Sequence, residues 1–473
     1  MGFERKHVSK LVPANLNLLP PLLLAVAIVN SATLGYDASV MNALLILPSY
    51  TEYFHLETAT EGLNNAASWM GSIVGAFLMQ PIPDHFGRRR AILVASGTAV
   101  VGIILQAAAQ NIIMFVVARI IVGIGSSVSN GAAPTLLGEL LPHHKRGRVL
   151  GLFFSCFYVG SLASAIVNYG SQNIQSTWSW RLPSLLQLEP SLLAVVLVPF
   201  VPESPRWLIA NKRDDEALEV LVIMQGKGVE DLQQGRESLH EIRAIMKKEE
   251  EEYPRNPWRE IIATPANRKM LAILCTFGLM INMFGNFVIS FYLTKILGQA
   301  GIKEAVKQTQ IQVILNCWSF AVAVFGSFML DVLARRAQSF IGITGMSATP
   351  YAIGGLIKSR PARLLHDTAV FGSNTTPEYG EGTSQSGIYG TVAVVFLFQG
   401  FCAFSITPMT SLYPTEVSQY KLRATGIAIF RMLEEIAVKF EGSRILDAAT
   451  EDPDPRETGD AKVSGEFNAK AVA

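Results

Sequence analysis

Two ionisable side chains lie inside apolar segments of this sequence. Asp37 directly follows the segment from Leu11 to Tyr36, which contains no charged residue. Arg119 is the only charged residue between Ala91 and Gly138. A lone charge in the middle of a bilayer costs about 2.5–3.5 kcal/mol, so each of these side chains needs a partner. We therefore expect Asp37 and Arg119 to pair with each other.

An acid held in this way could carry a proton. A neighbouring arginine favours the ionised form of Asp37, whereas removal from water favours its neutral form. A carboxyl group balanced between these two influences takes up and releases a proton as its surroundings change. The alternative is a static ion pair that only locks two helices together. Ionisable residues within membrane-spanning segments are usually functional, which favours the proton carrier.

Amide side chains form a second polar group within the apolar segments. Asn282 and Asn286 are four residues apart, so they lie one turn apart on the same face of a helix. Gln187 and Asn316 occupy two other apolar segments. Each amide offers donors and acceptors that suit adjacent hydroxyl groups of a ligand. For Gln187, Asn282 and Asn316, hydrogen bonding between helices is an equally good interpretation, because polar residues often join helices in membranes.

The elements that must position these residues are long apolar helices. Hydrophobic residues make up 50% of the 473 residues and charged residues only 16%, against about 25% in soluble domains. A helix needs about 20 apolar residues to cross a bilayer. Ten segments meet this requirement and predict an all-α membrane protein. Their centres lie near Ala25, Ile73, Val101, Gly123, Tyr158, Val195, Ile281, Val322, Thr349 and Phe398.

Basic residues predict the orientation of these spans. Lys and Arg are concentrated at the N-terminus and after the even-numbered spans, and cytoplasmic loops are enriched in both. The net charge of +1 gives no electrostatic reason to expect nucleic acid as a partner. We expect a cytoplasmic N-terminus at 1–15, a bundle of six spans at 16–201, a cytoplasmic helical linker at 202–269, a bundle of four spans at 270–426 and a cytoplasmic tail at 427–473.

The two predicted halves carry matching charged residues after corresponding spans. A general excess of basic residues in cytoplasmic loops explains the arginines but not the acids at matching spacings, which favours two parallel, repeated halves. We expect the acids to pair with arginines of neighbouring loops and so to bias the inward-facing and outward-facing states. These residues are Asp84, Arg88, Arg89, Glu139 and Arg146 in the first half, and Asp331, Arg335, Glu416 and Arg423 in the second.

Several motifs together resemble the sugar porters of the major facilitator superfamily. The resemblance implies a major facilitator fold of two helical bundles, a central sugar site that includes Asn286, and Asp37 as the proton carrier. It also implies a gating role for Glu203 and Arg206. The motifs are Gly35-Tyr36-Asp37, Asp84-x-x-Gly-Arg-Arg, Arg119-x-x-x-Gly-x-Gly, Glu139-x-x-Pro-x-x-x-Arg-Gly and Pro202-Glu-Ser-Pro-Arg-Trp207, while Gly285-Asn286 and Tyr413-Pro-Thr-Glu416 resemble the fungal lactose-permease-like branch.

The end of the sequence departs from the pattern of these sugar porters. After Arg423 the family continues into two further spans, whereas no apolar stretch of spanning length follows Phe404 here. We therefore expect about ten spans, with the last two family helices missing. The leading hypothesis is a monomeric sugar:proton symporter of the plasma membrane, with both termini cytoplasmic. The alternatives are a non-transporting membrane sugar sensor and a truncated, inactive transporter isoform.

The sequence gives no indication of an enzyme. No histidine lies in any predicted span, and no Ser-His-Asp, Cys-His or metal-ligand spacing occurs. We expect no cofactor and no metal, and we expect the sugar, protons and the lipid bilayer as partners.

Overall fold

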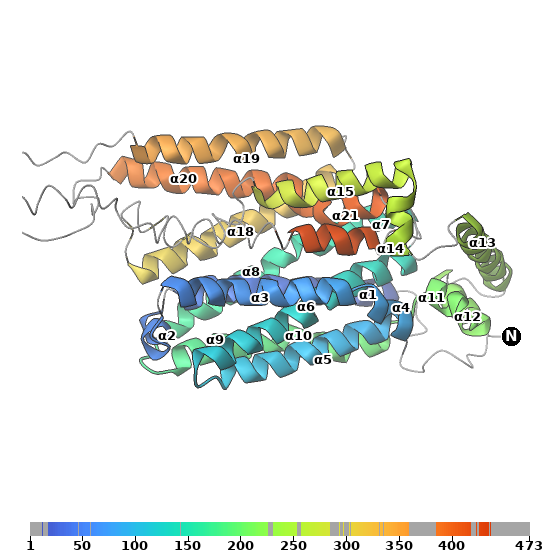
Figure 1. The fold of residues 1–473 in the computed structure, drawn as a ribbon, viewed down its shortest axis with the longest axis horizontal. Coiled ribbons are helices and arrows are strands. Elements are labelled where there is room, and N and C mark those ends of the chain that lie inside the picture. Colours follow the sequence, from blue (N-terminus) through green and yellow to red (C-terminus); the bar gives the residue numbers. More distant parts are fainter. Residues whose placement is uncertain are drawn as a thin grey trace, which may run out of the picture.

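The computed structural model shows only helices among its regular elements, over the part of the chain that it describes (Figure 1). This part comprises residues 12, 18–45, 47–56, 58–141, 143–225, 230–252, 257–283, 293, 297, 302, 304–330, 332–333, 335–358, 385–417, 422, 425–434 and 436.

The N-terminal half forms one group of helices. α6 packs against both α3 and α5, while α1 packs against α8. Asn111 caps the start of α6, because its side chain accepts a hydrogen bond from the Met114 backbone N–H at 2.8 Å. The bounds are α1 Leu19–Leu44, α2 Pro48–Tyr53, α3 Thr58–Leu78, α5 Arg88–Ala107, α6 Ile112–Leu140, α7 His143–Ser155, α8 Phe157–Ser171, α9 Trp178–Leu186, α10 Leu188–Leu197 and the 3₁₀ turn η1 Val198–Phe200.

The C-terminal half forms a second group beside the first (Figure 1). Its bounds are α15 Pro265–Met283, α18 Ala305–Met329, α19 Arg335–Lys358, α20 Gln385–Phe401, the π-helical turn η2 Cys402–Ile406 and α21 Thr407–Val417. The two halves contact each other where α7 and α8 pack against α18, and where α7 meets α21.

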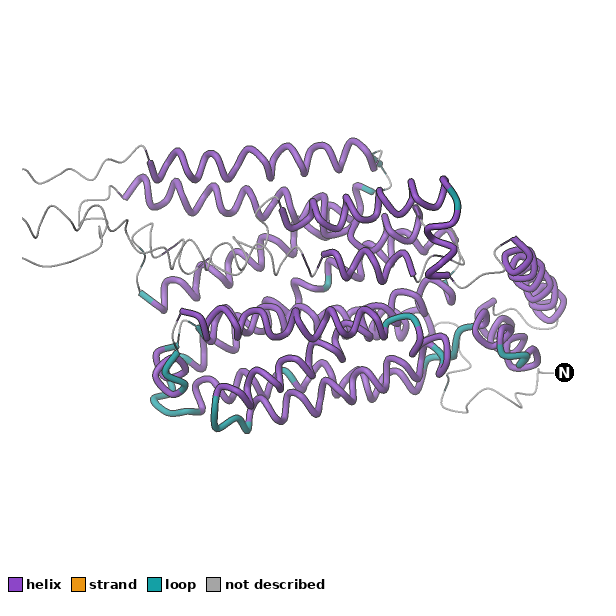
Figure 2. The backbone as a smooth tube through the Cα atoms, viewed as in Figure 1, coloured by secondary structure: helices purple, strands orange, loops and turns teal. Residues whose placement is uncertain are grey.

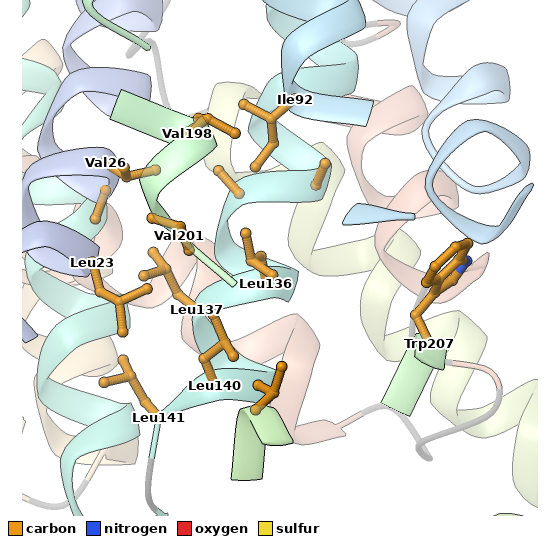
Figure 3. Close-up of a cluster of buried hydrophobic side chains, with 14 of the residues drawn as sticks. Leu23, Val26, Ile92, Leu136, Leu137, Leu140, Leu141, Val198, Val201 and Trp207 are labelled. Atoms are coloured by element: carbon orange, nitrogen blue, oxygen red, sulfur yellow. The ribbon is translucent and has the colours of Figure 1, made fainter. Parts of the chain in front are cut away.

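Each half has a hydrophobic core of its own. In the N-terminal half, Leu23 and Val26 of α1 pack with Leu136 of α6 and Val198 of η1 (Figure 3). In the C-terminal half, a separate buried cluster includes Phe398 of α20. These two clusters share no residue, and a smaller buried cluster of Tyr158, Ala323 and Ala403 lies between the halves.

Helices occupy all ten positions at which spans are predicted. Seven described segments are long and apolar enough to cross a membrane. The helices α3, α15 and α19 are not among these seven, so composition alone supports fewer than ten spans. The seven are Leu19–Leu44, Arg88–Ala107, Ile112–Leu140, Val149–Ser171, Trp178–Phe200, Ala305–Met329 and Tyr389–Thr410.

Glycines allow two pairs of helix backbones to approach closely. A Cβ atom on Gly160 of α8 would lie 1.9 Å from the Ala32 carbonyl oxygen of α1. A Cβ atom on Gly71 of α3 would lie 2.1 Å from the Ile120 carbonyl oxygen of α6. Small residues at such crossings are typical of membrane helix packing. The crossing of α1 and α8 fixes the part of α1 that carries Asp37.

Short helices lie at one end of the bundles, which we call the linker end (Figures 1 and 2). α4 (Pro81–Phe86) connects α3 to α5 there. After η1 the chain continues into α11 Pro205–Ala210, α12 Asp214–Gln225, α13 Glu230–Glu252 and α14 Pro257–Ala263. The segment predicted as a helical linker is therefore mostly helical where it is described, with non-helical residues at 202–204, 211–213 and 264.

A helix at residues 425–434 contacts both halves. Thr425 donates a hydrogen bond to the Gln80 side chain near the end of α3, at 2.9 Å. Phe430 is fully buried and stacks on Phe277 of α15, with ring centroids 5.8 Å apart. Arg431 lies over the Phe154 ring of α7 at 4.8 Å. This helix therefore joins the N-terminal bundle to α15.

Candidate functional site

Asp37 is buried within the N-terminal bundle, with only 3% of its surface exposed. Its carboxylate accepts hydrogen bonds from the Ser126 hydroxyl of α6 and from the Gln187 side-chain amide, which lies between α9 and α10. The neighbouring Tyr36 donates a hydrogen bond to the Pro183 carbonyl of α9 at 2.9 Å. Asp37 therefore links α1 to α6 and to the α9–α10 segment.

Arg119 is also buried, with 1% of its surface exposed, and it acts on Asp37 electrostatically. The two side chains form no direct ion pair, so their expected pairing is electrostatic and not by contact. The Ser126 hydroxyl and the Gln187 amide are instead the side-chain donors that lie within hydrogen-bonding distance of the carboxylate. Two guanidinium nitrogens of Arg119, Nε and Nη1, have no hydrogen-bond partner in the structure. The acid and the base thus share one buried region without neutralising each other by contact.

Aromatic rings of α2, α6 and α9 pack together near Arg119. Tyr50 packs against Phe54, Phe115 and Trp180, with ring centroids between 5.2 and 5.9 Å from its own. The Tyr50 hydroxyl accepts a hydrogen bond from Asn64 of α3 at 3.2 Å. These rings form part of a buried cluster that also contains Tyr36. The cluster shields the charged pair from water on this side.

The predicted ligand-binding amides have different surroundings. Gln187 is fully buried and bound to Asp37, so the structure places it with the acid. Asn316 of α18 accepts a hydrogen bond from the Ser161 hydroxyl of α8 at 2.9 Å, and thereby connects the two bundles. The Asn282 side chain and the whole of Asn286 lie outside the described residues.

Four predicted gating residues of the first half come together at the linker end. Arg88 forms ion pairs with Asp84 and with Glu139, each at 3.3 Å. Glu203 accepts hydrogen bonds from the backbone N–H groups of Arg88 and Arg89 at 2.9 and 3.1 Å. The Glu203 carboxylate therefore caps the start of α5, a role that usually belongs to the residue just before the helix.

The neighbouring residues Ser204 and Trp207 complete this group. Ser204 donates to Glu139, and Trp207 donates to the Asp84 backbone carbonyl at 2.9 Å. We call Asp84, Arg88, Glu139, Glu203 and Ser204 the linker-end cluster. It joins the ends of α4, α5, α6 and α11, as the sequence predicts for the acids and Arg88.

The remaining predicted gating residues are less fully described. Arg89 donates to the Pro199 carbonyl at 2.7 Å, and Arg206 is half-buried on α11. Arg335 is exposed at the start of α19. Asp331 and Arg423 lie outside the described residues, as do the side chains of Arg146 and Glu416. The matching cluster of the second half thus stays a prediction.

Two hydroxyl groups of the site are absent from the sequence-based prediction. Ser126 lies seven residues, or two helical turns, after Arg119, so both share one face of α6. That spacing could have identified Ser126. Ser204 lies between Glu203 and Arg206 in their motif, but its contact with Glu139, 65 residues away, is set by the tertiary fold.

Replacing Glu203 by alanine should destabilise the protein. The substitution leaves the first N–H groups of α5 without their acceptor, and hydrogen bonds to a charged group contribute about 1.5–3 kcal/mol each. The unfolding midpoint of the purified protein should fall clearly below that of the wild type. Glu251→Ala is the matched control, because the Glu251 side chain is 70% exposed on α13. Equal midpoints for the two variants would contradict the capping role.

The pH dependence of this effect follows from the burial of Glu203. Burial raises the pKa of Glu203, against the opposing influence of the backbone N–H groups and Arg88. The folded protein then binds a proton at Glu203 more readily than the unfolded chain. The contribution of Glu203 to stability therefore falls as the pH rises from the pKa of this group in the unfolded chain to its raised pKa in the folded protein. The wild type should therefore lose stability relative to Glu203→Gln over this acidic range. A difference in midpoint that does not vary with pH would contradict this assignment.

Two helical bundles, with buried charges inside one and polar contacts between them, are the architecture of a major facilitator transporter. The fold is similar to that of the proton:xylose symporter XylE bound to 6-bromo-6-deoxy-D-glucose, with a TM-score of 0.74 at 18% sequence identity. That similarity covers 96% of this chain and 92% of the XylE chain. A partially occluded inward-open structure of XylE from E. coli matches with a TM-score of 0.69, at 18% identity over 90% of this chain and 92% of that chain.

The sequence places the chain within this class more narrowly. The family described as "Sugar (and other) transporter" matches residues 23–440, so the chain belongs to this family and is an integral membrane protein. The glucose transporter GlcP of Staphylococcus epidermidis is 28% identical over 67% of this chain and 67% of its own length. The high-affinity glucose transporter of Kluyveromyces lactis is 27% identical over 85% of this chain and 73% of its own length.

Proposed function

We propose that this protein moves a sugar across a membrane together with a proton, by alternating access of the two bundles. The observation that carries the proposal is the buried carboxyl group of Asp37, held by Ser126 and Gln187 beside the buried Arg119. Family membership supports a sugar as the substrate. Neither the family nor the relatives favour a non-transporting sensor or an inactive isoform.

The relatives guide the choice of substrates to test. GlcP and the Kluyveromyces lactis protein are named as glucose transporters, and XylE as a proton:xylose symporter. The motifs around Asn286 and Glu416 point instead to a disaccharide, through their resemblance to the lactose-permease-like branch. Hexoses, pentoses and disaccharides therefore all belong in the test.

A proton on Asp37 would change the contacts between helices. The ionised carboxylate only accepts hydrogen bonds, whereas the neutral acid also donates one. Protonation also removes its attraction to Arg119. Because Ser126 lies on α6 and Gln187 lies next to α10, either change alters how α1 is held by its neighbours. A ligand that binds two conformations unequally shifts the balance between them, and a proton bound at Asp37 acts in the same way.

The orientation of the protein is part of this proposal. The linker end carries the basic residues Arg88, Arg89 and Arg90, which favours the cytoplasmic side. We place 1–15, the helical linker 202–269 and 427–473 on that side, and the bundles 16–201 and 270–426 in the plasma membrane. The protein acts as a monomer in this scheme, and Glu139 and Arg146 belong to the cytoplasmic gate.

Uptake into proteoliposomes tests the proposed function. A panel of radiolabelled mono- and disaccharides is presented with and without an inward proton gradient. We expect at least one sugar to accumulate above its external concentration when the gradient is present, and only to equilibrate when a protonophore removes it. Equilibration alone under both conditions would show uniport, and no uptake of any sugar would overturn the proposal.

A further inference from the structure

Tyr158 of α8 reaches from the N-terminal bundle into the C-terminal bundle. Its hydroxyl shares a hydrogen bond with the Thr407 hydroxyl at 3.3 Å and accepts one from the Gln399 side-chain amide at 3.4 Å. Tyr158 is 5% exposed, and it packs with Ala323 of α18 and Ala403 of η2. Three polar side chains from both bundles therefore meet at one buried point of the interface.

Gln399 has an unused acceptor at this point. Only 9% of the surface of Gln399 is exposed, and its Oε1 atom has no hydrogen-bond partner in the structure. A buried acceptor without a donor costs about 1–3 kcal/mol. This cost is offset when a ligand supplies a donor. A hydroxyl group suits this position, because it can donate to Oε1 and accept from a neighbouring donor.

The π-helical turn η2 brings Gln399 and Thr407 toward one side of their helix. Residues eight apart in a regular α-helix point about 80° away from each other, since each residue turns the helix by about 100°. Cys402–Ile406 separates the two residues and forms a wider turn, which reduces this offset. Turns of this type occur often at functional sites.

The same face of α8 carries a second polar contact with the C-terminal bundle. Ser161 lies three residues after Tyr158 and donates to Asn316 of α18 at 2.9 Å. Ser161 also shares a hydrogen bond with Ser39 of α1. The predicted ligand-binding residue Asn316 and the Tyr158 group therefore lie one helical turn apart along the interface.

We propose that Tyr158, Gln399 and Thr407 form a hydroxyl-recognising subsite for the transported sugar, next to Asn316, an inference that rests on the proposed function. In the absence of sugar the three side chains bind one another across the interface. A sugar hydroxyl replaces one of these hydrogen bonds and donates to Gln399 Oε1. The subsite determines which sugars are accepted, because a sugar without that hydroxyl leaves Oε1 unpaired.

Sugar binding to purified protein in lipid nanodiscs tests this subsite. The probe is a sugar that binds to the wild type, together with its series of monodeoxy analogues. We expect Gln399→Leu to raise the dissociation constant of the full sugar about tenfold, because one hydrogen bond to a buried amide is lost. Gln310→Leu is the matched control, since Gln310 is exposed on α18, and it should change the constant less than twofold.

The deoxy analogues separate recognition of the sugar from a purely structural link between the bundles. The wild type should bind one deoxy analogue clearly more weakly than the full sugar, whereas Gln399→Leu should bind the two about equally. If Gln399→Leu keeps the wild-type affinity for the full sugar, or the wild-type preference for it over the analogue, the subsite is overturned and the proposed function is not affected. A wild type that binds no sugar would overturn the proposed function instead.

A second variant tests the subsite if Gln399→Leu does not fold. Size-exclusion chromatography reports whether Gln399→Leu is monodisperse. If it is not, Tyr158→Phe carries the same test, because it removes the hydroxyl that holds Gln399 and keeps the ring. Tyr158→Phe should weaken the sugar's binding and reduce the preference against the same analogue. A folded Tyr158→Phe variant with wild-type affinity and preference would overturn the subsite.

Discussion

Asp37→Asn should abolish the accumulation of sugar against a gradient. Asparagine has nearly the same shape and still offers an acceptor to Ser126 or Gln187, but it cannot bind or release a proton. The ratio of internal to external sugar in proteoliposomes with an inward proton gradient should fall to about one. Exchange of labelled for unlabelled sugar without a gradient should continue, because it needs no net proton movement.

The control for this substitution is an exposed acid. Glu251→Gln changes the same charge on α13, where the side chain is 70% exposed, and it should accumulate sugar like the wild type. Asp37→Asn that still accumulates sugar would remove Asp37 from the coupling mechanism. Loss of both accumulation and exchange, with folded protein, would show that Asp37 is needed for movement of the bundles as such.

Gly160→Leu should prevent the N-terminal bundle from folding. Even the first added carbon would lie 1.9 Å from the Ala32 carbonyl oxygen, and the atom it meets is backbone that cannot rotate away. Overpacking in a well-packed core costs about 1–3 kcal/mol where side chains can adjust, and more where backbones must separate. The yield of monodisperse protein after extraction in mild detergent should therefore fall to a small fraction of the wild-type yield.

Gly170→Leu provides a matched comparison on the same helix. A Cβ atom at Gly170 would meet nothing within 4 Å, and the residue is exposed. This variant should be extracted and should elute like the wild type. Similar behaviour of the two leucine variants would contradict the close approach of α1 and α8.

The helices could be predicted from the sequence because apolar segments of about 20 residues allow few other structures in a bilayer. The same reasoning identifies Asp37 and Arg119 as exceptional, since charges are costly there. The repeated motifs predict that the acids at the linker end pair with arginines, as Asp84 and Glu139 do with Arg88.

The partners of individual side chains could not be predicted in this way. Asp37 is bound by Gln187, which is 150 residues away, and Ser161 by Asn316, which is 155 residues away. Such contacts depend on how helices cross, and helical periodicity contains no information on crossing. Asp37 and Arg119 form no direct ion pair, because Ser126, on the same helix as Arg119, and Gln187 lie closer to the carboxylate.

Neutral hydrogen bonds connect the two halves at several levels, from Ser155–Ser327 to Ser161–Asn316, Tyr158–Thr407 and Thr425–Gln80. At about 0.5–1.5 kcal/mol each, they hold the halves together by only a few kcal/mol. A solute shifts the balance between two arrangements only by the difference in its binding free energy to them. Because the hydrogen bonds between the halves amount to only a few kcal/mol, a difference of that size is enough to invert the populations, without ATP or any other chemical fuel.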